Sequence, residues 1–144
     1  MSHRQFSIRR ARVDDELSVE SLARLLATTF SIDGELFHRL FNRLIDNDDA
    51  RILVSTDELE AINGYLLGFV HDAFFANGTV AWIEEMYVSD AARRNGIGRA
   101  LVGEFEGWAR DRDAKLIALA TRRAASFYSA VGYEDSAVYF MRLL

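Results

Sequence analysis

A short stretch rich in arginine and glycine is the part of the sequence best suited to chemistry. Arg93, Arg94 and Arg99 surround Gly96 and Gly98, after a strand-like apolar run. Where a helix begins, the first backbone N–H groups have no acceptor inside the helix and the helix dipole is positive, so anions bind there. Glycine lets the backbone approach a bulky phosphate, and arginine adds charge-assisted donors. The stretch therefore predicts a binding site for a pyrophosphate.

Two common nucleotide-binding loops do not fit this stretch. No Gly-Lys-Ser/Thr sequence follows the glycines, so the segment is not a P-loop. Leu101 stands where a dinucleotide-binding fingerprint has its third glycine. A nucleotide-binding domain of another kind stays open as an alternative.

The elements before this stretch read as a strand, two helices and a meander of strands. Phe6–Ile8, followed by two arginines, predicts a short first strand, and Asp14 or Asp15 is expected to cap a helix with apolar positions at Leu17, Leu22, Leu25, Leu26 and Phe30. Apolar residues from Leu36 to Ile45 step by one and three, which predicts a second, amphipathic helix capped by Asp33. Three strands follow at residues 51–55, 62–70 and 79–88, with an Asn77-Gly78 hairpin turn before the last.

The last third alternates helix and strand. A helix is predicted from Ile97, then an apolar strand at Leu116–Ala120 buried on both faces, then a short helix at Ala124–Val131 ended by Gly132. Ala137–Leu143 reads as a closing strand. A strand–helix–strand unit of this length implies a parallel pair joined by a crossover. We therefore expect a single α+β domain over residues 1–144. It has a three-layer arrangement and a mixed, mostly antiparallel sheet, whose one parallel pair joins strands 79–88 and 116–120.

Composition bounds the class of protein. The chain has 144 residues, 50% apolar and 27% charged, which suits one ordinary globular domain. With 17 Lys+Arg against 22 Asp+Glu the net charge is −5, so nucleic acid is not an expected partner. No apolar run approaches membrane-helix length, no secretory signal is visible and cysteine is absent, so we expect a cytoplasmic protein without membrane association or a cysteine nucleophile. His3, His38 and His71 lack ligand-like spacing, and no metal site is expected.

Three motifs at compatible spacing make the sequence resemble the GNAT family of N-acetyltransferases. The family's Gln/Arg-x-x-Gly-x-Gly/Ala signature reads Arg93-Arg94-Asn95-Gly96-Ile97-Gly98, and the apolar-x-Val element before it reads Met86-Tyr87-Val88. Its aromatic-Tyr-x-x-x-Gly-aromatic element reads Phe127-Tyr128-Ser129-Ala130-Val131-Gly132-Tyr133. One position departs: Thr121 stands where many members have asparagine.

The resemblance implies transfer of an acetyl group from acetyl-CoA, the cosubstrate, to an amine of a small molecule or peptide by direct attack on the thioester. Backbone groups of Met86 and Val88 would pair with the pantetheine arm, the Met86 N–H would polarise the thioester carbonyl, and amides of residues 94–99 would hold the pyrophosphate. The residues expected to contact the cosubstrate are Met86, Tyr87, Val88, Arg93, Arg94, Asn95, Gly96, Ile97, Gly98, Arg99 and Thr121.

The reaction needs a base for the amine and an acid for the leaving thiolate. Glu84 and Glu85 lie inside an otherwise apolar strand, where carboxylates are costly to bury, and by strict alternation Glu84 shares a face with Met86 and Val88. We favour Glu84 for the amine, with Glu85 as the alternative. The resemblance assigns the acid to Tyr128. A non-catalytic acyl-CoA-binding module is the competing function, the acceptor amine is left open, and a homodimer is possible.

Overall fold

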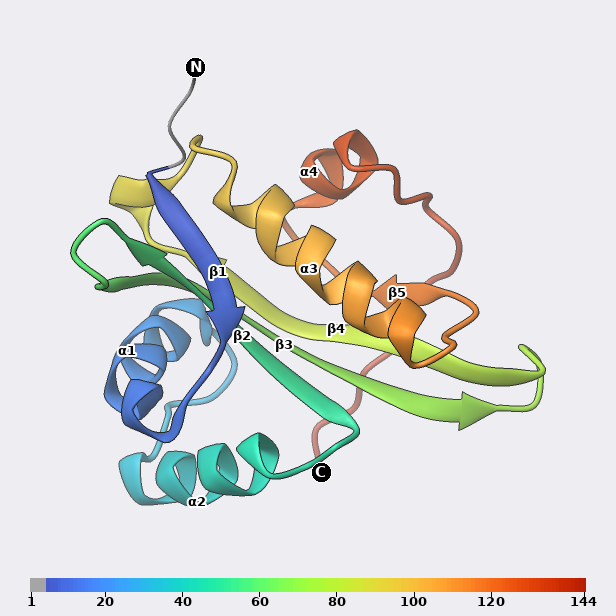
Figure 1. The fold of residues 1–144 in the computed structure, drawn as a ribbon. Helices are drawn as coiled ribbons and strands as arrows, with labels where there is room; N and C mark the ends of the chain where they lie inside the picture. Colours follow the sequence, from blue (N-terminus) through green and yellow to red (C-terminus); the bar gives the residue numbers. More distant parts are fainter. Residues whose placement is uncertain (1–4) are drawn as a thin grey trace.

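The computed structural model describes residues 5–144 and contains one five-stranded sheet with helices on both sides (Figure 1). The strands are β1 (Phe6–Arg10), β2 (Ala50–Asp57), β3 (Ile62–Ala73), β4 (Gly78–Val88) and β5 (Ile117–Leu119). The helices are α1 (Glu16–Leu26), α2 (Gly34–Ile45), α3 (Ile97–Asp111) and α4 (Ala125–Ala130), with 3₁₀ turns at Val13–Asp15 and Asp90–Ala92. The strand order is β1-β2-β3-β4-β5, antiparallel except for the parallel β4–β5 pair. The expected α+β class and its single parallel pair are thus confirmed.

Alternating side chains of the central strands form two cores, one on each face of the sheet. On one face Leu66 and Ile83 pack with Leu101 and Phe105 of α3, and α4 adds Tyr128. On the other face Val54 and Tyr65 pack with Leu22 of α1 and Phe41 of α2. Figure 1 shows α3 running along the strands, apart from the α1–α2 pair. The sheet is therefore the middle of three layers, and residues of β4 can reach either outer layer.

Local sequence signals explain several element boundaries. The Asp33 carboxylate accepts a 2.9 Å hydrogen bond from the Leu36 N–H and caps α2, as expected. Asn77 (φ 57°) and Gly78 (φ 153°) form the turn between β3 and β4. Gly132, with φ 99°, follows α4 in the left-handed region, where a glycine is not strained. These three predictions hold because each depends only on neighbouring residues.

The start of α1 differs from the expected cap. Asp15 precedes the helix, but its carboxylate accepts from the Arg12 N–H at 2.7 Å and pairs with the Arg9 guanidinium at 2.6 and 2.9 Å. Asp15 therefore joins β1 to the turn before the helix. The expected apolar face of α1 is correct only in part: Leu22 and Leu26 pack on the core, but Leu17, Leu25 and Phe30 are exposed. The other buried positions are Val19 and Ala23.

The two predictions for the end of the chain need correction. β5 is only three residues long and half-buried, rather than buried on both faces, because it lies at the sheet edge with β4 as its only strand partner in the described chain. The closing strand expected at Ala137–Leu143 does not form: residues 134–144 belong to no helix or strand. The apolar pattern was strand-like, but a strand also needs a hydrogen-bonding partner.

No helix within residues 5–144 has the length and apolar character needed to cross a membrane.

Candidate functional site

The arginine–glycine stretch forms the turn between β4 and α3. β4 ends at Val88, the 3₁₀ turn Asp90–Ala92 follows, and α3 begins at Ile97. Arg94 (φ 67°) and Gly96 (φ 85°) both adopt left-handed backbone conformations, which curl the chain just before the helix. The sequence prediction of a helix that opens at the two glycines is confirmed.

This turn presents a row of backbone donors. In the described part of the chain, none of the N–H groups from Arg94 to Arg99 donates to a protein acceptor; the first helical N–H with one is that of Ala100, which bonds the Gly96 carbonyl at 3.0 Å. Gly96 occupies the cap position and has no side chain that could accept. Because unpaired N–H groups at a helix start attract anions, the turn can hold a phosphate or pyrophosphate.

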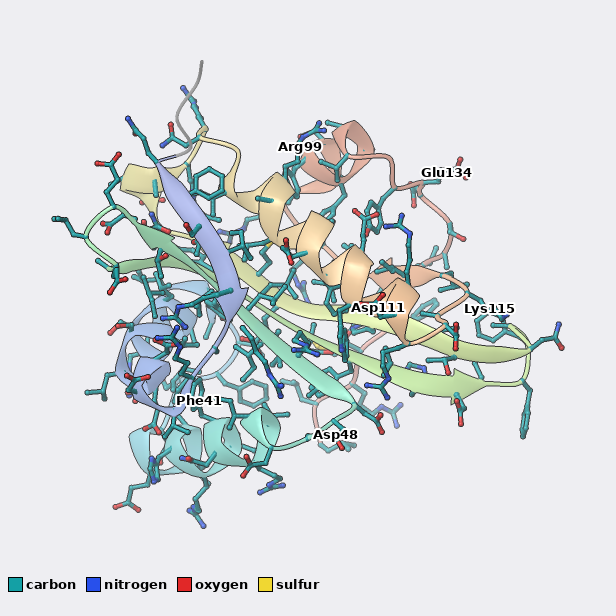
Figure 2. All side chains as sticks on the ribbon, in the orientation of Figure 1. Phe41, Asp48, Arg99, Asp111, Lys115 and Glu134 are labelled. Carbon is teal, nitrogen blue, oxygen red and sulfur yellow. The ribbon has the colours of Figure 1, made fainter. Side chains whose placement is uncertain are left out.

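The three arginines differ in their availability. The Arg93 guanidinium is engaged within the chain: it pairs with Asp90 at 2.9 Å, donates to the Val88 carbonyl at 3.0 Å and lies 5.2 Å from the Tyr87 ring centre. Arg93 therefore shapes the turn more than it offers charge to a ligand. Arg99 extends from the start of α3 toward α4, with one weak 3.5 Å contact to a carbonyl there (Figure 2). Arg94 and Arg99 are both exposed.

The second half of β4 has a strand on one side only. β5 pairs with β4 from Ala81–Ile117 to Ile83–Leu119 and no further in the described chain, whereas β3 pairs with β4 as far as Val88. The backbone of residues 84–88 therefore has an edge without a strand partner, beside the anion-binding turn. An extended ligand with amide groups can bind such an edge as an added strand.

The pairing between β4 and β5 ends next to a β-bulge at Glu84. Leu67 lies opposite Glu85 while the next residue of β3, Gly68, lies opposite Ile83, so Glu84 is the extra residue. After the bulge, Met86 and Val88 pack on the α3 face and Tyr87 on the α1–α2 face. The expected common face of Glu84 with Met86 and Val88 is therefore lost, and the Glu84 side chain is exposed.

Glu85 is the half-buried acid of this strand, and a buried tyrosine holds it. The Tyr65 hydroxyl, on β3, donates a 2.8 Å hydrogen bond to Glu85 Oε1, and Tyr65 is 2% exposed. Burial raises the pKa of Glu85; the Tyr65 hydrogen bond lowers it in part, and the neighbouring Glu84 charge adds to the rise. Sequence analysis missed Tyr65, because a tyrosine inside an apolar strand gives no sign of which strand residue it will face.

Tyr128 lies on the other side of the sheet, in the core formed with α3. It is buried, and its ring packs edge-to-face against Phe127 at 4.9 Å and Tyr133 at 5.8 Å between centres. Burial raises the pKa of Tyr128, so its hydroxyl stays protonated at neutral pH. Glu85, held by Tyr65 of the α1–α2 core, and Tyr128, in the α3 core, thus lie on opposite faces of the sheet.

Phe127 connects the short helix to the anion-binding turn. A Cβ added at Gly98 would lie 3.2 Å from Phe127 Cζ and 3.7 Å from Met86 Cε. Glycine at this position therefore permits close packing of α3, α4 and β4. Thr121, at the position that departs from the family pattern, accepts from the Ala124 N–H at 3.0 Å and so orders the chain before α4.

Within the described residues no cluster of three His, Asp or Glu side chains is arranged to hold a metal ion. Of the three histidines considered from the sequence, His3 lies outside the described residues.

Comparison with known proteins agrees with this geometry. The model of the acetyltransferase (GNAT) family matches residues 19–133, which is most of the chain. The chain belongs to the GNAT family. Acetyl transfer is the general reaction of this family, and all three motifs quoted from the sequence lie within the matched residues.

Solved structures share the fold at low sequence identity. Glucosamine-6-phosphate N-acetyltransferase from Arabidopsis thaliana matches with a TM-score of 0.85 and 22% identity, over 96% of this chain and 97% of that one. Aminoglycoside 6'-N-acetyltransferase AAC(6')-Ih from Acinetobacter baumannii matches with a TM-score of 0.79 and 18% identity, over 96% and 99%. A transcriptional regulator from Bacillus halodurans C-125 matches with a TM-score of 0.83 and 26% identity, over 96% and 99%. No curated protein matches the sequence.

Proposed function

We propose that this GNAT protein is an N-acetyltransferase that uses acetyl-CoA as the acetyl donor and an amine as the acceptor. The observation that carries the proposal is the run of unpaired N–H groups at residues 94–99 beside the open edge of β4. Together these offer donors for a pyrophosphate and a strand edge for an amide-containing arm. Coenzyme A has both parts, in that order, so the residues present fit it.

Each part of the site has its own binding task. The backbone N–H groups of residues 94–99 would hold the pyrophosphate, with the exposed Arg94 and Arg99 adding positive charge nearby. The edge of Met86, Tyr87 and Val88 would bind the pantetheine arm through backbone hydrogen bonds. Bound acetyl-CoA supplies an activated acetyl thioester, and the Met86 N–H is the donor proposed for its carbonyl oxygen.

Glu85 is the base that we propose for the acceptor amine. An alkylammonium must lose a proton before it can attack, and a carboxylate whose pKa is raised by burial is a better acceptor for that proton than an ordinary one. The hydrogen bond from Tyr65 fixes one carboxylate oxygen and leaves the other to receive the proton, directly or through water. Glu84, favoured from the sequence, is exposed in the bulge and is the alternative base.

Tyr128 is the acid that we propose for the departing thiolate. Its buried hydroxyl holds a proton at neutral pH and can reload from solvent after donating it. Thr121 stays a proposed cosubstrate contact, because its hydroxyl accepts the Ala124 N–H and its own O–H is still available to donate.

For the acceptor we propose a small amine. The similar structures named above include acetyltransferases named for glucosamine-6-phosphate and for aminoglycosides, which all carry amino groups on sugar rings. A net charge of −5 also favours cationic amines over anionic acceptors.

The deciding experiment measures release of the coenzyme A thiol from acetyl-CoA against a panel of amino sugars, aminoglycosides and polyamines. The chain has no cysteine, so every thiol detected comes from the cosubstrate. We expect amine-dependent thiol release that Glu85→Gln reduces far more than Glu84→Gln does. A larger loss with Glu84→Gln would move the role of base to Glu84.

A thermal-shift series separates the competing functions. A ligand at 100 times its dissociation constant stabilises a protein by about 2.7 kcal/mol, and we expect this with coenzyme A but not with ATP or NAD. Stabilisation without turnover of any amine would support a non-catalytic acyl-CoA-binding module. Stabilisation by ATP or NAD alone would contradict the proposal and favour another nucleotide-binding function.

A further inference from the structure

A buried hydroxyl near the end of β2 holds the side chain of a bulged residue in β3. Ser55 is fully buried, and its hydroxyl donates a 2.6 Å hydrogen bond to Asn63 Oδ1. In the β2–β3 ladder Ser55 lies opposite Gly64, and the next residue of β2 lies opposite Ile62. Asn63, between these two, is therefore the extra residue of a β-bulge. Because a buried hydroxyl without a partner is costly, the hydrogen bond fixes the two side chains relative to each other.

The backbone of Asn63 holds the first residue of the anion-binding turn. The Ser89 N–H, one residue beyond the end of β4, donates a 2.9 Å hydrogen bond to the Asn63 carbonyl. The Ser89 carbonyl in turn accepts from the Ala92 N–H at 2.9 Å. Figure 1 shows the β2–β3 connection and the turn before α3 at the same end of the sheet. The position of Asn63 thus determines where the chain leaves β4.

Gly64, the residue after Asn63, lies against the other end of the turn. A Cβ added at Gly64 would lie 3.4 Å from Ile97 Cγ2, and Ile97 is the buried first residue of α3. The same Cβ would lie 3.3 Å from the Tyr87 carbonyl oxygen and 2.7 Å from Ser55 Oγ, too close for a real side chain. Asn63 and Gly64 therefore connect β2 to both ends of the anion-binding turn.

We propose that the Ser55–Asn63 hydrogen bond positions the anion-binding turn and thereby sets the affinity for coenzyme A, an inference that rests on the proposed function. The N–H groups of residues 94–99 can converge on one pyrophosphate only if the turn that carries them is held at both ends. Ser55 is a positioning residue, because a fully buried hydroxyl cannot touch the ligand. Its effect reaches the ligand through Asn63 and Ser89.

The first test measures the affinity for coenzyme A by titration calorimetry without any amine. We expect Ser55→Ala to raise the dissociation constant about tenfold, the effect of losing one such hydrogen bond. The KM for acetyl-CoA should rise by a similar factor while kcat stays unchanged, whereas a mere loss of folded protein would lower kcat and leave KM unchanged. The matched control is Thr56→Val, which removes the neighbouring buried hydroxyl but keeps the bond to Asn63. Unchanged affinity in Ser55→Ala would overturn the proposal.

A double variant tests whether the two side chains act through the same contact. Asn63→Ala should weaken coenzyme A binding as Ser55→Ala does, and Ser55→Ala/Asn63→Ala should be no weaker than either single variant, because one hydrogen bond serves both residues. Additive losses would mean that each side chain acts by its own packing, and they would contradict the proposal.

Hydrogen exchange of the protein without ligand gives a readout that does not need coenzyme A. The Ser89 amide should exchange at least about tenfold faster in Ser55→Ala than in the unaltered protein, since its acceptor is no longer fixed. The Ala81 amide, which donates to the Leu116 carbonyl at 2.9 Å earlier on β4, is the internal reference and should not change.

The exchange data also separate this inference from the proposed function. An unaltered protein that does not bind coenzyme A would contradict the proposed function, while the Ser89 amide would still report whether Ser55 positions the turn. Equal exchange of the Ser89 amide in both proteins would overturn the positioning role. Exchange that becomes faster by the same factor at Ser89 and Ala81 would overturn it too, because Ser55 would then stabilise the fold as a whole.

Discussion

The hydroxyl of Tyr65 lies 2.8 Å from Glu85 Oε1 and donates a hydrogen bond to it across the β3–β4 pair. The contact joins a fully buried tyrosine to the half-buried carboxyl that we propose as the base. Because the hydrogen bond favours the charged form of the carboxyl, it opposes the effect of burial on the Glu85 pKa. Tyr65 therefore acts as a positioning residue, setting both the orientation of Glu85 and the pH at which it loses its proton.

Replacing Tyr65 by phenylalanine should raise the pKa of Glu85 further, because the opposing hydrogen bond is lost while burial stays. The acid limb of the kcat/KM profile for the amine should move to higher pH, and the rate at a fixed pH on that limb should fall about tenfold per pH unit of that displacement. The measurement is a pH–rate profile of both proteins. A lower rate with an unmoved acid limb would mean that Tyr65 has only a packing role.

Glu85→Gln should reduce kcat/KM by about 10²–10⁴-fold, the usual contribution of a general base. The same change should stabilise the fold at neutral pH. The folded-state pKa of Glu85 lies above the ordinary value of 4.5, so its contribution to stability is complete below that value and is lost as the pH rises through the folded-state pKa.

Urea denaturation at two pH values checks the stability part of this prediction. The midpoint of Glu85→Gln should exceed that of the unaltered protein at pH 7, and the difference should vanish at a pH below 4.5, where both side chains are neutral. Equal stability at neutral pH would contradict the assigned direction of the pKa shift.

Tyr128→Phe should lower kcat by about 10²-fold or more with little change in the KM for acetyl-CoA, because it removes a proton donor but preserves ring packing. Steady-state kinetics give both constants. Tyr133→Phe is the control: the Tyr133 hydroxyl is buried and has no hydrogen-bond partner in the described chain, so its loss should be neutral or stabilising. Equal loss of kcat in the two variants would argue against an acid role for Tyr128.

Gly98→Ala should weaken acetyl-CoA binding, because the added Cβ would crowd Phe127 beside the anion-binding turn. A tenfold rise in the dissociation constant corresponds to about 1.4 kcal/mol, and we expect an effect of that order by titration calorimetry. Gly103→Ala on the same helix has nothing within 4 Å of its Cβ. It should leave binding unchanged and stabilise α3 by about 0.5–1 kcal/mol.

Asp15→Asn should destabilise the fold by about 3 kcal/mol, because it leaves the Arg9 charge without its nearly buried partner. Burial opposes ionisation of Asp15, but the hydrogen bonds from Arg9 and the Arg12 N–H outweigh it and lower the pKa below 3.8. This stabilisation is present above pH 3.8 and is lost as the pH falls through the folded-state pKa. Chemical denaturation against pH measures it, and Asp14→Asn, at an exposed neighbour, should show neither effect.

Local signals explain why much of the fold was predictable from the sequence. The Asp33 cap, the Asn77-Gly78 turn and the glycines that open α3 each depend on a few adjacent residues. The family motifs, which also lie within short segments, located the turn and Tyr128 in the same way.

Features that depend on pairing between distant residues were not predictable. The bulge at Glu84 depends on how β3 meets β4, and it decides which glutamate is buried. The same register brings Tyr65 to Glu85, 20 residues away. The Arg93 side chain was expected at the ligand, but Asp90 and the Val88 carbonyl engage it once the turn has formed. The closing strand failed for a related reason, since apolar alternation says nothing about where a partner strand lies.

Glu84, the extra residue in β4, is not needed for packing of the core, but it is needed for the open edge of the proposed site. Ile83 and Met86 both pack on the α3 face, so a chain lacking Glu84 would keep each core side chain in its present layer and restore an uninterrupted strand. Such a strand would lose the local bend of a bulge and could continue its pairing with β5. Position 84 thus contributes to the open edge of β4 through its added length of backbone and not through its side chain. Exchanging its side chain would not reveal that contribution, whereas shortening the strand by this one residue would.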